Sequence, residues 1–500
     1  PSGCSQSDGS EIESVVATPA RFSQGSASGV GESLLPSLKR VLTAAGYEPE
    51  VLDEVRRLGQ FLPAEEVVAA AEGVRRGPVR LATLVRLLAL GATVSRAQAR
   101  RALHPLSLED LASAGIVEAD GPGVRAPVRV LAYEGLLLIG DRVEIESRDM
   151  VRALYGASST NSAALTPRDP ARSMLDIGTG SGVQALLASR HCEHVVGIDV
   201  NPRAIEFARN NAQMNCVANA TWHVGDYFEP VDGERFDLIV GNPPYVVSPD
   251  RDFTYRDSDR DGDELMASLC RDVSEHLEEG GLGILVCEWP HATEADWAAA
   301  PRRWTTAGGC DSIVVCGSTN DPFDHALGWN RPPNRRLAPA ELNRVITRWH
   351  THCRQTGTGA ISSGVVVLRR RERGRRWSLV ARVDARQGDH AARQVHRIIA
   401  GNDVLAESDL LDRRFAVPEG LRISQPLERR DSAWVTRAAH ASAPGELGVT
   451  AAIDPATLDA VFRCNGAKTL GELVAGDPRC GQVEVAVREL LSRGLLDVVA

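Results

Sequence analysis

The chain has 500 residues, a length that predicts about three domains, and its 43% hydrophobic and 24% charged residues are those of an ordinary globular protein. It contains no run of about 18 consecutive apolar residues, which excludes a helical membrane span. A formal net charge of −10 argues against a protein that coats nucleic acid nonspecifically, although it does not exclude a local basic face.

The N-terminal third is expected to be helical after a short leader. Residues 1–29 are rich in Ser and Gly and have no basic region followed by an apolar one, so they predict a disordered leader and not a signal peptide. Residues 30–133 carry apolar residues at three- and four-residue spacing and then change to strand-like alternation. Short helices followed by a hairpin predict a helical, winged-helix-like domain.

Strands and helices alternate from residue 134 to residue 371, which predicts an α/β domain with a doubly wound, mostly parallel sheet. The gap between the sixth and seventh predicted strands is long enough for an insertion near the carboxyl edge of the sheet. Residues 372–500 are expected to form a separate α+β domain that ends in a winged-helix-like unit. The seven predicted strands are residues 173–178, 194–200, 220–226, 236–242, 282–289, 311–317 and 361–371.

The strongest binding signal is the segment LDIGTGSGVQALLA, in which glycines follow an apolar strand and open a helix. Glycines allow a tight turn there and let a ligand lie against the backbone at the helix N-terminus. The next strand ends at Asp199, 21 residues after Gly178, which is about the separation at which an acid meets a ribose. A dinucleotide-binding domain and an inactive scaffold are the alternatives at this point.

The G-x-G-x-G spacing with an acid two residues ahead resembles the class I methyltransferases that use S-adenosylmethionine (SAM). The resemblance implies that the glycine loop holds the methionine end of SAM with Asp176 near its amino group. It also implies that Asp199 meets the ribose hydroxyls, Asp226 meets the adenine amino group and Tyr227 lines the base. The implied SAM-binding residues are Asp176, Gly178, Thr179, Gly180, Gly182, Asp199, Val200, Asp226 and Tyr227.

Asn242-Pro243-Pro244-Tyr245 ends the fourth predicted strand, at the edge where doubly wound sheets bind ligands. The same four residues mark methyltransferases that act on planar nitrogens, whose lone pair is delocalised and therefore weakly nucleophilic. The Asn242 side-chain oxygen and the Pro243 carbonyl can each accept one N–H of such a nitrogen and hold it in line for attack. The prolines fix the backbone, and Tyr245 is expected to stack on the planar group.

Two further segments have less specific patterns. Glu288, Trp289 and His291 end the fifth predicted strand and either border the substrate pocket or belong to the core. Residues 255–265 directly follow the NPPY motif and are rich in acids and arginines. They are expected to be a solvated loop, with a lid over the substrate as the alternative.

The methyl acceptor predicted from these features is the side-chain amide of a protein or peptide. A helical domain before the catalytic domain resembles the release-factor glutamine methyltransferases, and this likeness covers roughly residues 134–300. An exocyclic amine of RNA or DNA is the alternative acceptor, favoured by the arginines of residues 369–376. A third hypothesis is a SAM-binding regulator that has lost catalysis.

Cysteine usage adds an expectation about location. The ten cysteines form no CxxC pair and have no metal-like spacing, so no metal site is expected. Scattered cysteines in a chain of this length indicate reduced, mostly buried thiols. They predict a cytoplasmic protein without a membrane partner.

Overall fold

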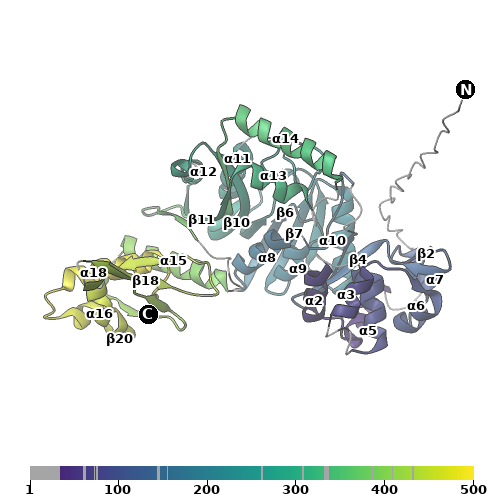
Figure 1. Ribbon diagram of the computed structural model, residues 1–500. Helices are drawn as coiled ribbons and strands as arrows, with labels where there is room; N and C mark the ends of the chain where they lie inside the picture. Colours follow the sequence, from purple (N-terminus) through teal and green to yellow (C-terminus); the bar gives the residue numbers. More distant parts are fainter. Residues whose placement is uncertain are drawn as a thin grey trace, which may run out of the picture.

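The computed structural model places the N-terminal helices and the C-terminal part on opposite sides of a central sheet domain (Figure 1). Within the described ranges, no helix has the length and apolar character that crossing a bilayer requires. The predicted leader, residues 1–29, lies outside the described residues. The structure describes residues 34–59, 64–71, 74, 77–142, 147–154, 156–258, 260, 263–306, 309–331, 337–383, 388, 390–407, 409–430 and 433–499.

The N-terminal part combines helices with a small three-stranded sheet of order β1-β3-β2. Ser95 begins α6 with a capping box, because its side chain accepts from the Gln98 backbone N–H and the Gln98 side chain accepts from the Ser95 N–H. Its elements are α1 (Leu34–Ala44), α2 (Pro49–Gly59), α3 (Ala64–Ala70), α5 (Val79–Leu84), the π-helical turn η1 (Val85–Ala89), β1 (Val94–Ser95), α6 (Arg96–Leu103), α7 (Leu108–Ser113), β2 (Glu118–Asp120) and β3 (Gly123–Arg125).

A hairpin of β4 (Val128–Tyr133) and β5 (Leu136–Asp141) joins this part to the central domain. The side chain of Asn211 in α10 (Pro202–Met214) accepts from the Ile139 N–H at 2.7 Å and donates to the Ile139 carbonyl at 3.0 Å. The hairpin is therefore bonded to a helix of the central domain, and the boundary predicted between residues 133 and 134 falls inside it.

The central domain is Rossmann-like, with one large mixed sheet of order β13-β11-β12-β10-β9-β6-β7-β8. Its core is parallel, and β12 runs antiparallel between β10 and β11. The strands are β6 (Ala171–Ile177), β7 (Cys192–Asp199), β8 (Ala220–Val224), β9 (Phe236–Gly241), β10 (Leu277–His291), β11 (Cys310–Asn320), β12 (Ala360–Arg370) and β13 (Ser378–Arg382).

All seven predicted strands lie in this sheet, but the predicted count is wrong by one. The eighth strand, β13, pairs in parallel with β11, although its residues lie beyond the predicted boundary at residue 371. The helix α15 (Ala391–Glu407) also packs its buried residues Ala391, Val395 and Ile398 into the core that covers one face of the sheet. The sheet thus extends into the part of the chain expected to be a separate domain.

Helices cover both faces of the sheet, each over its own apolar core. On one face α11 (Glu264–His276) and α12 (Ala299–Thr306) pack against the strands, and on the other α8 (Gly156–Leu165), α9 (Val183–Ala188) and α15 do so. The insertion between β11 and β12 forms α13 (Pro322–Asn330) and α14 (Pro339–Gln355), which pack against each other.

The C-terminal part has an apolar core of its own. Thr469 begins α17 with a capping box closed by Glu472. The elements of the C-terminal part are β14 (Arg414–Ala416), β15 (Arg422–Ser424), β16 (Leu427–Arg430), β17 (Ala433–Thr436), β18 (Ala439–Ser442), β19 (Ala451–Ile453), α16 (Leu458–Phe462), β20 (Asn465–Thr469), α17 (Leu470–Val474), α18 (Cys480–Ser492) and β21 (Asp497–Val499).

Candidate active site

A pocket lies at the carboxyl ends of the central strands, where the chain order reverses beside β6. It encloses about 1120 Å³, its open mouth included. Of the thirteen residues predicted to bind SAM or to catalyse, Gly182 alone does not line it. Those that do are Asp176, Gly178, Thr179, Gly180, Asp199, Val200, Asp226, Tyr227, Asn242, Pro243, Pro244 and Tyr245.

Asp176 closes the glycine loop from inside. Its carboxylate accepts from the Thr179 hydroxyl at 2.7 Å and from the Ala185 backbone N–H, in the first turn of α9, at 3.1 Å. Burial raises the pKa of Asp176 to about 7, against the lowering effect of those two bonds. The loop is thus built around an acid whose charge is costly in the absence of a cation.

Gly182 does not line the pocket and has a structural role at the start of α9. It caps α9 in the left-handed conformation, with φ of 86°. A Cβ at this position would lie 3.1 Å from the Trp222 ring and 3.2 Å from the Ala208 side chain. Glycine is required here because α9 packs closely on its neighbours, and the role is one of holding the loop and not of lining the pocket.

Asp199 ends β7 and holds the loop from the other side. It accepts from the Gly180 N–H and from the Asn201 N–H, both at 2.9 Å. Burial raises the pKa of Asp199. The next side chain, Val200, is 57% exposed although it is apolar, and it lines the pocket. An exposed apolar side chain beside acids suits a ligand with a flat ring attached to hydroxyl groups.

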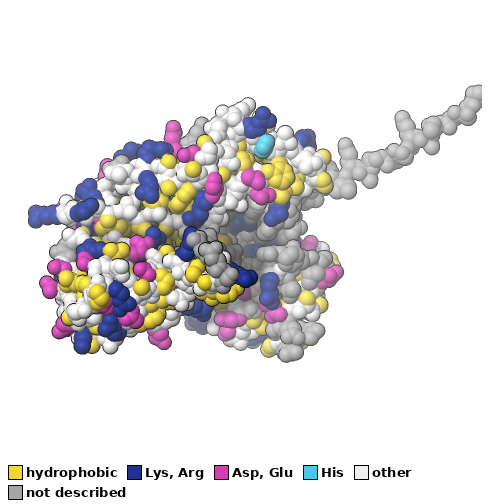
Figure 2. All heavy atoms as spheres, turned by 60° about the vertical axis from the view of Figure 1, so that its left-hand side comes forward, with side chains coloured by type: hydrophobic (Ala, Val, Ile, Leu, Met, Phe, Trp, Pro, Cys, Tyr) yellow, Lys and Arg dark blue, Asp and Glu magenta, His cyan; other side chains and the backbone are white. Residues whose placement is uncertain are grey.

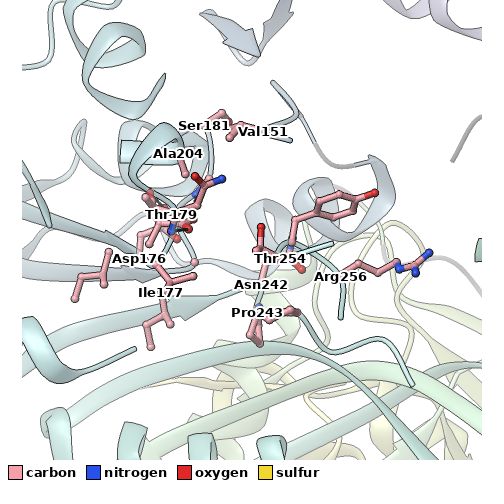
Figure 3. A pocket seen from close by; sticks show the side chains of 18 of the residues that line it. Val151, Asp176, Ile177, Thr179, Ser181, Ala204, Asn242, Pro243, Thr254 and Arg256 are labelled. Carbon is pink, nitrogen blue, oxygen red and sulfur yellow. Dashed lines mark hydrogen bonds between the residues drawn. The ribbon is translucent and has the colours of Figure 1, made fainter. Parts of the chain in front are cut away.

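The NPPY motif faces the glycine loop across the pocket (Figure 3). A Cβ on Gly178 would lie 3.7 Å from the Asn242 carbonyl oxygen and 3.9 Å from the Pro243 Cα. The two motifs, which are 60 residues apart in sequence, are therefore neighbours, as the sequence predicts.

Asn242 has one satisfied and one unsatisfied polar end. Its side-chain nitrogen donates to the Ser158 hydroxyl at 3.2 Å. Its side-chain oxygen is buried and has no hydrogen-bond partner among the residues that the structure describes. A buried acceptor without a donor is costly in a native protein, and at a pocket wall it indicates where a ligand N–H belongs.

Ser158 also reaches the last residue of the motif. A hydrogen bond links it to the Tyr245 hydroxyl, although burial is the larger effect and raises the pKa of that phenol. One hydroxyl of α8 therefore holds both polar side chains of the NPPY motif. No sequence pattern marks Ser158, since it lies in a run of small residues, GASSTNS.

Two segments roof the pocket. Residues 150–152 line it from the chain before α8, and residues 254–256 line it from the loop after the NPPY motif. The two meet where the Thr254 N–H and hydroxyl both lie 3.0 Å from the Arg148 carbonyl. In Figure 3, Thr254 lies beside Asn242, and the Arg256 side chain points away from the glycine loop.

The expectation of a solvated loop over residues 255–265 is wrong at its start. Arg256 is only 2% exposed. Its guanidinium lies 2.7 Å from the Asp257 carboxylate and 3.6 Å from Asp250, which also accepts from the Trp349 indole at 2.8 Å. These ion pairs fold the loop back onto α14, because a buried cation needs close counter-charges.

The acids and rings that end β10 are placed differently from one another. Trp289 is fully buried in the core, and His291 is buried with its ring bonded to Ser362 and Thr293. Neither lines the main pocket. Glu288 lies behind Tyr245, where both residues line a smaller second pocket. Trp329 of α13, which the sequence did not indicate, lines the main pocket.

Two of the arginines expected to favour nucleic acid, Arg369 and Arg371, are paired with acids of the protein, whereas Arg373, Arg375 and Arg376 are exposed. Arg369 donates to Asp311 at 3.1 Å and to Asp403 at 2.6 Å, and Arg371 donates to Asp403 at 2.7 Å. Acidic and basic side chains are interspersed over the face that Figure 2 shows. Neither observation supports a broad basic surface.

Two family models match separate parts of this chain. Residues 160–292 match the family described as methyltransferase small domain, and residues 55–127 match a domain of unknown function. The first span contains every residue of the glycine loop and the NPPY motif.

Relatives with named activities match parts of this chain. A release factor glutamine methyltransferase of Aliivibrio fischeri is 40% identical over 89 residues, which are 17% of this chain and 31% of the relative. One of Geobacter sulfurreducens is 36% identical over 131 residues, 24% and 46% of the two chains. A ribosomal protein uL3 glutamine methyltransferase of Bradyrhizobium diazoefficiens is 29% identical over 221 residues, 37% and 67% of the two chains. The chain thus spans less than half the length of the first two relatives.

Proposed function

We propose, from the premise that residues 160–292 form a class I methyltransferase domain, that this chain transfers a methyl group from SAM to the side-chain amide nitrogen of a protein. The observation that carries the proposal is the buried Asn242 side-chain oxygen, which has no donor among the described residues and lies at the pocket wall. An amide NH₂ supplies the donor that this oxygen lacks.

The pocket fits SAM at both ends. Asp199 at the end of β7 and Asp226 after β8 offer carboxylates to the ribose hydroxyls and the adenine amino group, and Val200 and Tyr227 offer apolar surface to the base. Asp176 would lie near the cationic amino group, which suits an acid whose pKa burial raises. When bound, SAM supplies a methyl group on a positively charged sulfur.

The NPPY residues would prepare the acceptor nitrogen. The Asn242 side-chain oxygen and the Pro243 carbonyl would each accept one N–H, which orients the nitrogen toward the methyl carbon and favours its pyramidalisation, so that its lone pair is less delocalised into the carbonyl. The lone pair forms the new N–C bond, and the electrons of the broken C–S bond stay on sulfur. The nitrogen becomes acidic as it gains the methyl group, so one of its protons leaves through Asn242 to water and no strong base is needed.

A protein amide is favoured over a nucleic-acid base for two reasons. The named relatives act on a release factor and on a ribosomal protein. Two arginines of the cluster that was expected to bind nucleic acid, Arg369 and Arg371, are engaged with Asp311 and Asp403. The unsatisfied Asn242 oxygen argues against an inactive regulator, because a site without a substrate has no reason to keep a buried acceptor unpaired.

The test is transfer of labelled methyl groups from SAM to a cell extract, followed by protease or nuclease treatment of parallel samples. We expect the label to be lost to protease only. Asn242→Ala should bind SAM as tightly as wild type in calorimetry and transfer at least about 100-fold more slowly, the scale on which a preorganised polar group acts in catalysis. Label lost to nuclease would move the acceptor to RNA or DNA, and wild-type transfer by Asn242→Ala would refute the assigned site.

A further inference from the structure

Glu288 near the carboxyl end of β10 accepts from four donors in three separate segments, although it is only 5% exposed. One carboxylate oxygen accepts from the His325 ring at 2.9 Å and the Val247 N–H at 3.4 Å. The other accepts from the Ser363 hydroxyl at 3.1 Å and the Trp329 indole at 3.3 Å. A buried carboxylate is tolerated only when its lone pairs are used in this way.

Two of those donors belong to segments that line the main pocket, which would hold the acceptor amide and is called the acceptor pocket. Val247 follows Tyr245 by two residues, so its N–H fixes the backbone just after the NPPY motif. Trp329 lines the pocket from α13, and His325 anchors the same helix one turn earlier. The insertion between β11 and β12 is therefore bonded, through one side chain, to the strand end that carries the catalytic motif.

We propose that Glu288 is a positioning residue for methyl transfer, which holds the Tyr245 wall and the Trp329 wall at the separation that the planar acceptor requires. This role rests on the proposed function. The Tyr245 and Trp329 walls belong to segments about 80 residues apart. The directional hydrogen bonds of Glu288 hold the two walls in place, which an apolar contact would not do. Only a carboxylate serves, because it accepts at both oxygens, whereas an amide would turn its NH₂ against two of the four donors.

The test compares variants in the labelled-extract assay, with the initial rate measured over a series of extract concentrations. Glu288→Gln keeps the size of the side chain and loses two acceptor bonds. We expect kcat/KM to fall at least about tenfold while SAM affinity in calorimetry stays at the wild-type value. Trp329→Phe keeps an aromatic ring but removes the indole N–H that donates to Glu288. We expect the half-saturating extract concentration to rise several-fold and kcat to change less.

Ser362→Ala is the matched control for a merely structural loss. Its hydroxyl is fully buried and bonds His291 at 2.9 Å and Thr319 at 2.8 Å on the same strands, without reaching the acceptor pocket. We expect it to lower the melting temperature as Glu288→Gln does and to leave kcat/KM unchanged.

Two results would overturn the assignment of Glu288. They are wild-type kcat/KM in Glu288→Gln, and equal losses in Glu288→Gln and Ser362→Ala. The Asn242→Ala variant in the same assay separates this inference from the proposed function. If Asn242→Ala is inactive while Glu288→Gln is fully active, the positioning role alone fails. If Asn242→Ala remains active, the proposed function fails.

Discussion

Replacing Ser158 by Ala tests whether the orientation of the catalytic amide is set from outside the NPPY motif. The Ser158 hydroxyl accepts a hydrogen bond from the Asn242 side-chain nitrogen at 3.2 Å and is hydrogen-bonded to the Tyr245 hydroxyl. Without it, the Asn242 amide loses the contact that distinguishes its nitrogen end from its oxygen end. Both orientations then become accessible, and only one of them presents an acceptor to the substrate.

The magnitude follows from the bonds that are lost. A neutral hydrogen bond contributes a net 0.5–1.5 kcal/mol or so. Loss of the Asn242 bond, with partial loss of order at Tyr245, therefore amounts to about 1–2 kcal/mol, or roughly a 5- to 30-fold fall in kcat. The KM for SAM should not change, because the glycine loop and Asp199 keep all their bonds.

The assay is single-turnover methyl transfer with saturating SAM, alongside calorimetric titration of SAM. Ser158→Thr restores the hydroxyl and should recover most of the rate. Thr160→Ala, on the same helix, removes a hydroxyl that bonds only helix carbonyls and should leave the rate unchanged. A wild-type rate in Ser158→Ala would refute the reasoning, and so would an equal loss in Thr160→Ala.

Two further predictions concern the glycine loop. The pKa of Asp176 is about 7 when folded against a usual 3.8, so its ionisation destabilises the ligand-free protein increasingly as pH rises from about 4 to 7 and fully above 7. Asp176→Asn should therefore be more stable than wild type at pH 8, by as much as about 4 kcal/mol of unfolding free energy, and no more stable near pH 4. Urea unfolding at both pH values measures the two differences, and equal differences would contradict the buried-charge explanation. Gly182→Ala should lose about 2 kcal/mol of unfolding free energy in the same experiment, because its Cβ would sit at a φ of 86° and 3.1 Å from the Trp222 ring. Unchanged stability would show that the loop relaxes freely.

The pocket floor was predictable from sequence because its residues are fixed by local rules. Asp176, Asp199 and Asn242 each end an apolar strand, and parallel strand ends meet at one edge of a sheet. Glycine spacing and paired prolines report backbone constraints that do not depend on the rest of the chain. Twelve of the thirteen predicted residues line the pocket for this reason, and the exception, Gly182, is held one residue away in the helix cap.

The walls and roof were not predictable because they depend on contacts between distant segments. Ser158 acts through a helix that precedes β6, and Trp329 reaches the pocket from an insertion whose direction no periodicity encodes. The charged run around Arg256 predicts a surface residue, but Asp250 and Asp257 of the same loop and Trp349 of the distant helix α14 bury it. The strand β13 lies beyond the predicted boundary at residue 371, and only its pairing with β11, more than 60 residues earlier, places it in the central sheet.

The position of β12 has a consequence for how the chain reaches its folded state. This strand is made after both of its neighbours, β10 and β11, yet it pairs with both of them along most of its length. Until residues 360–370 leave the ribosome, the growing sheet has an open slot with unpaired backbone groups on either side, the kind of edge that recruits other chains. A fragment that stops at residue 292, where the family match ends, would keep β10 as such an edge permanently. The sheet that folds therefore extends beyond the span of the methyltransferase-family match, and expression of the central domain should begin from the whole eight-stranded sheet.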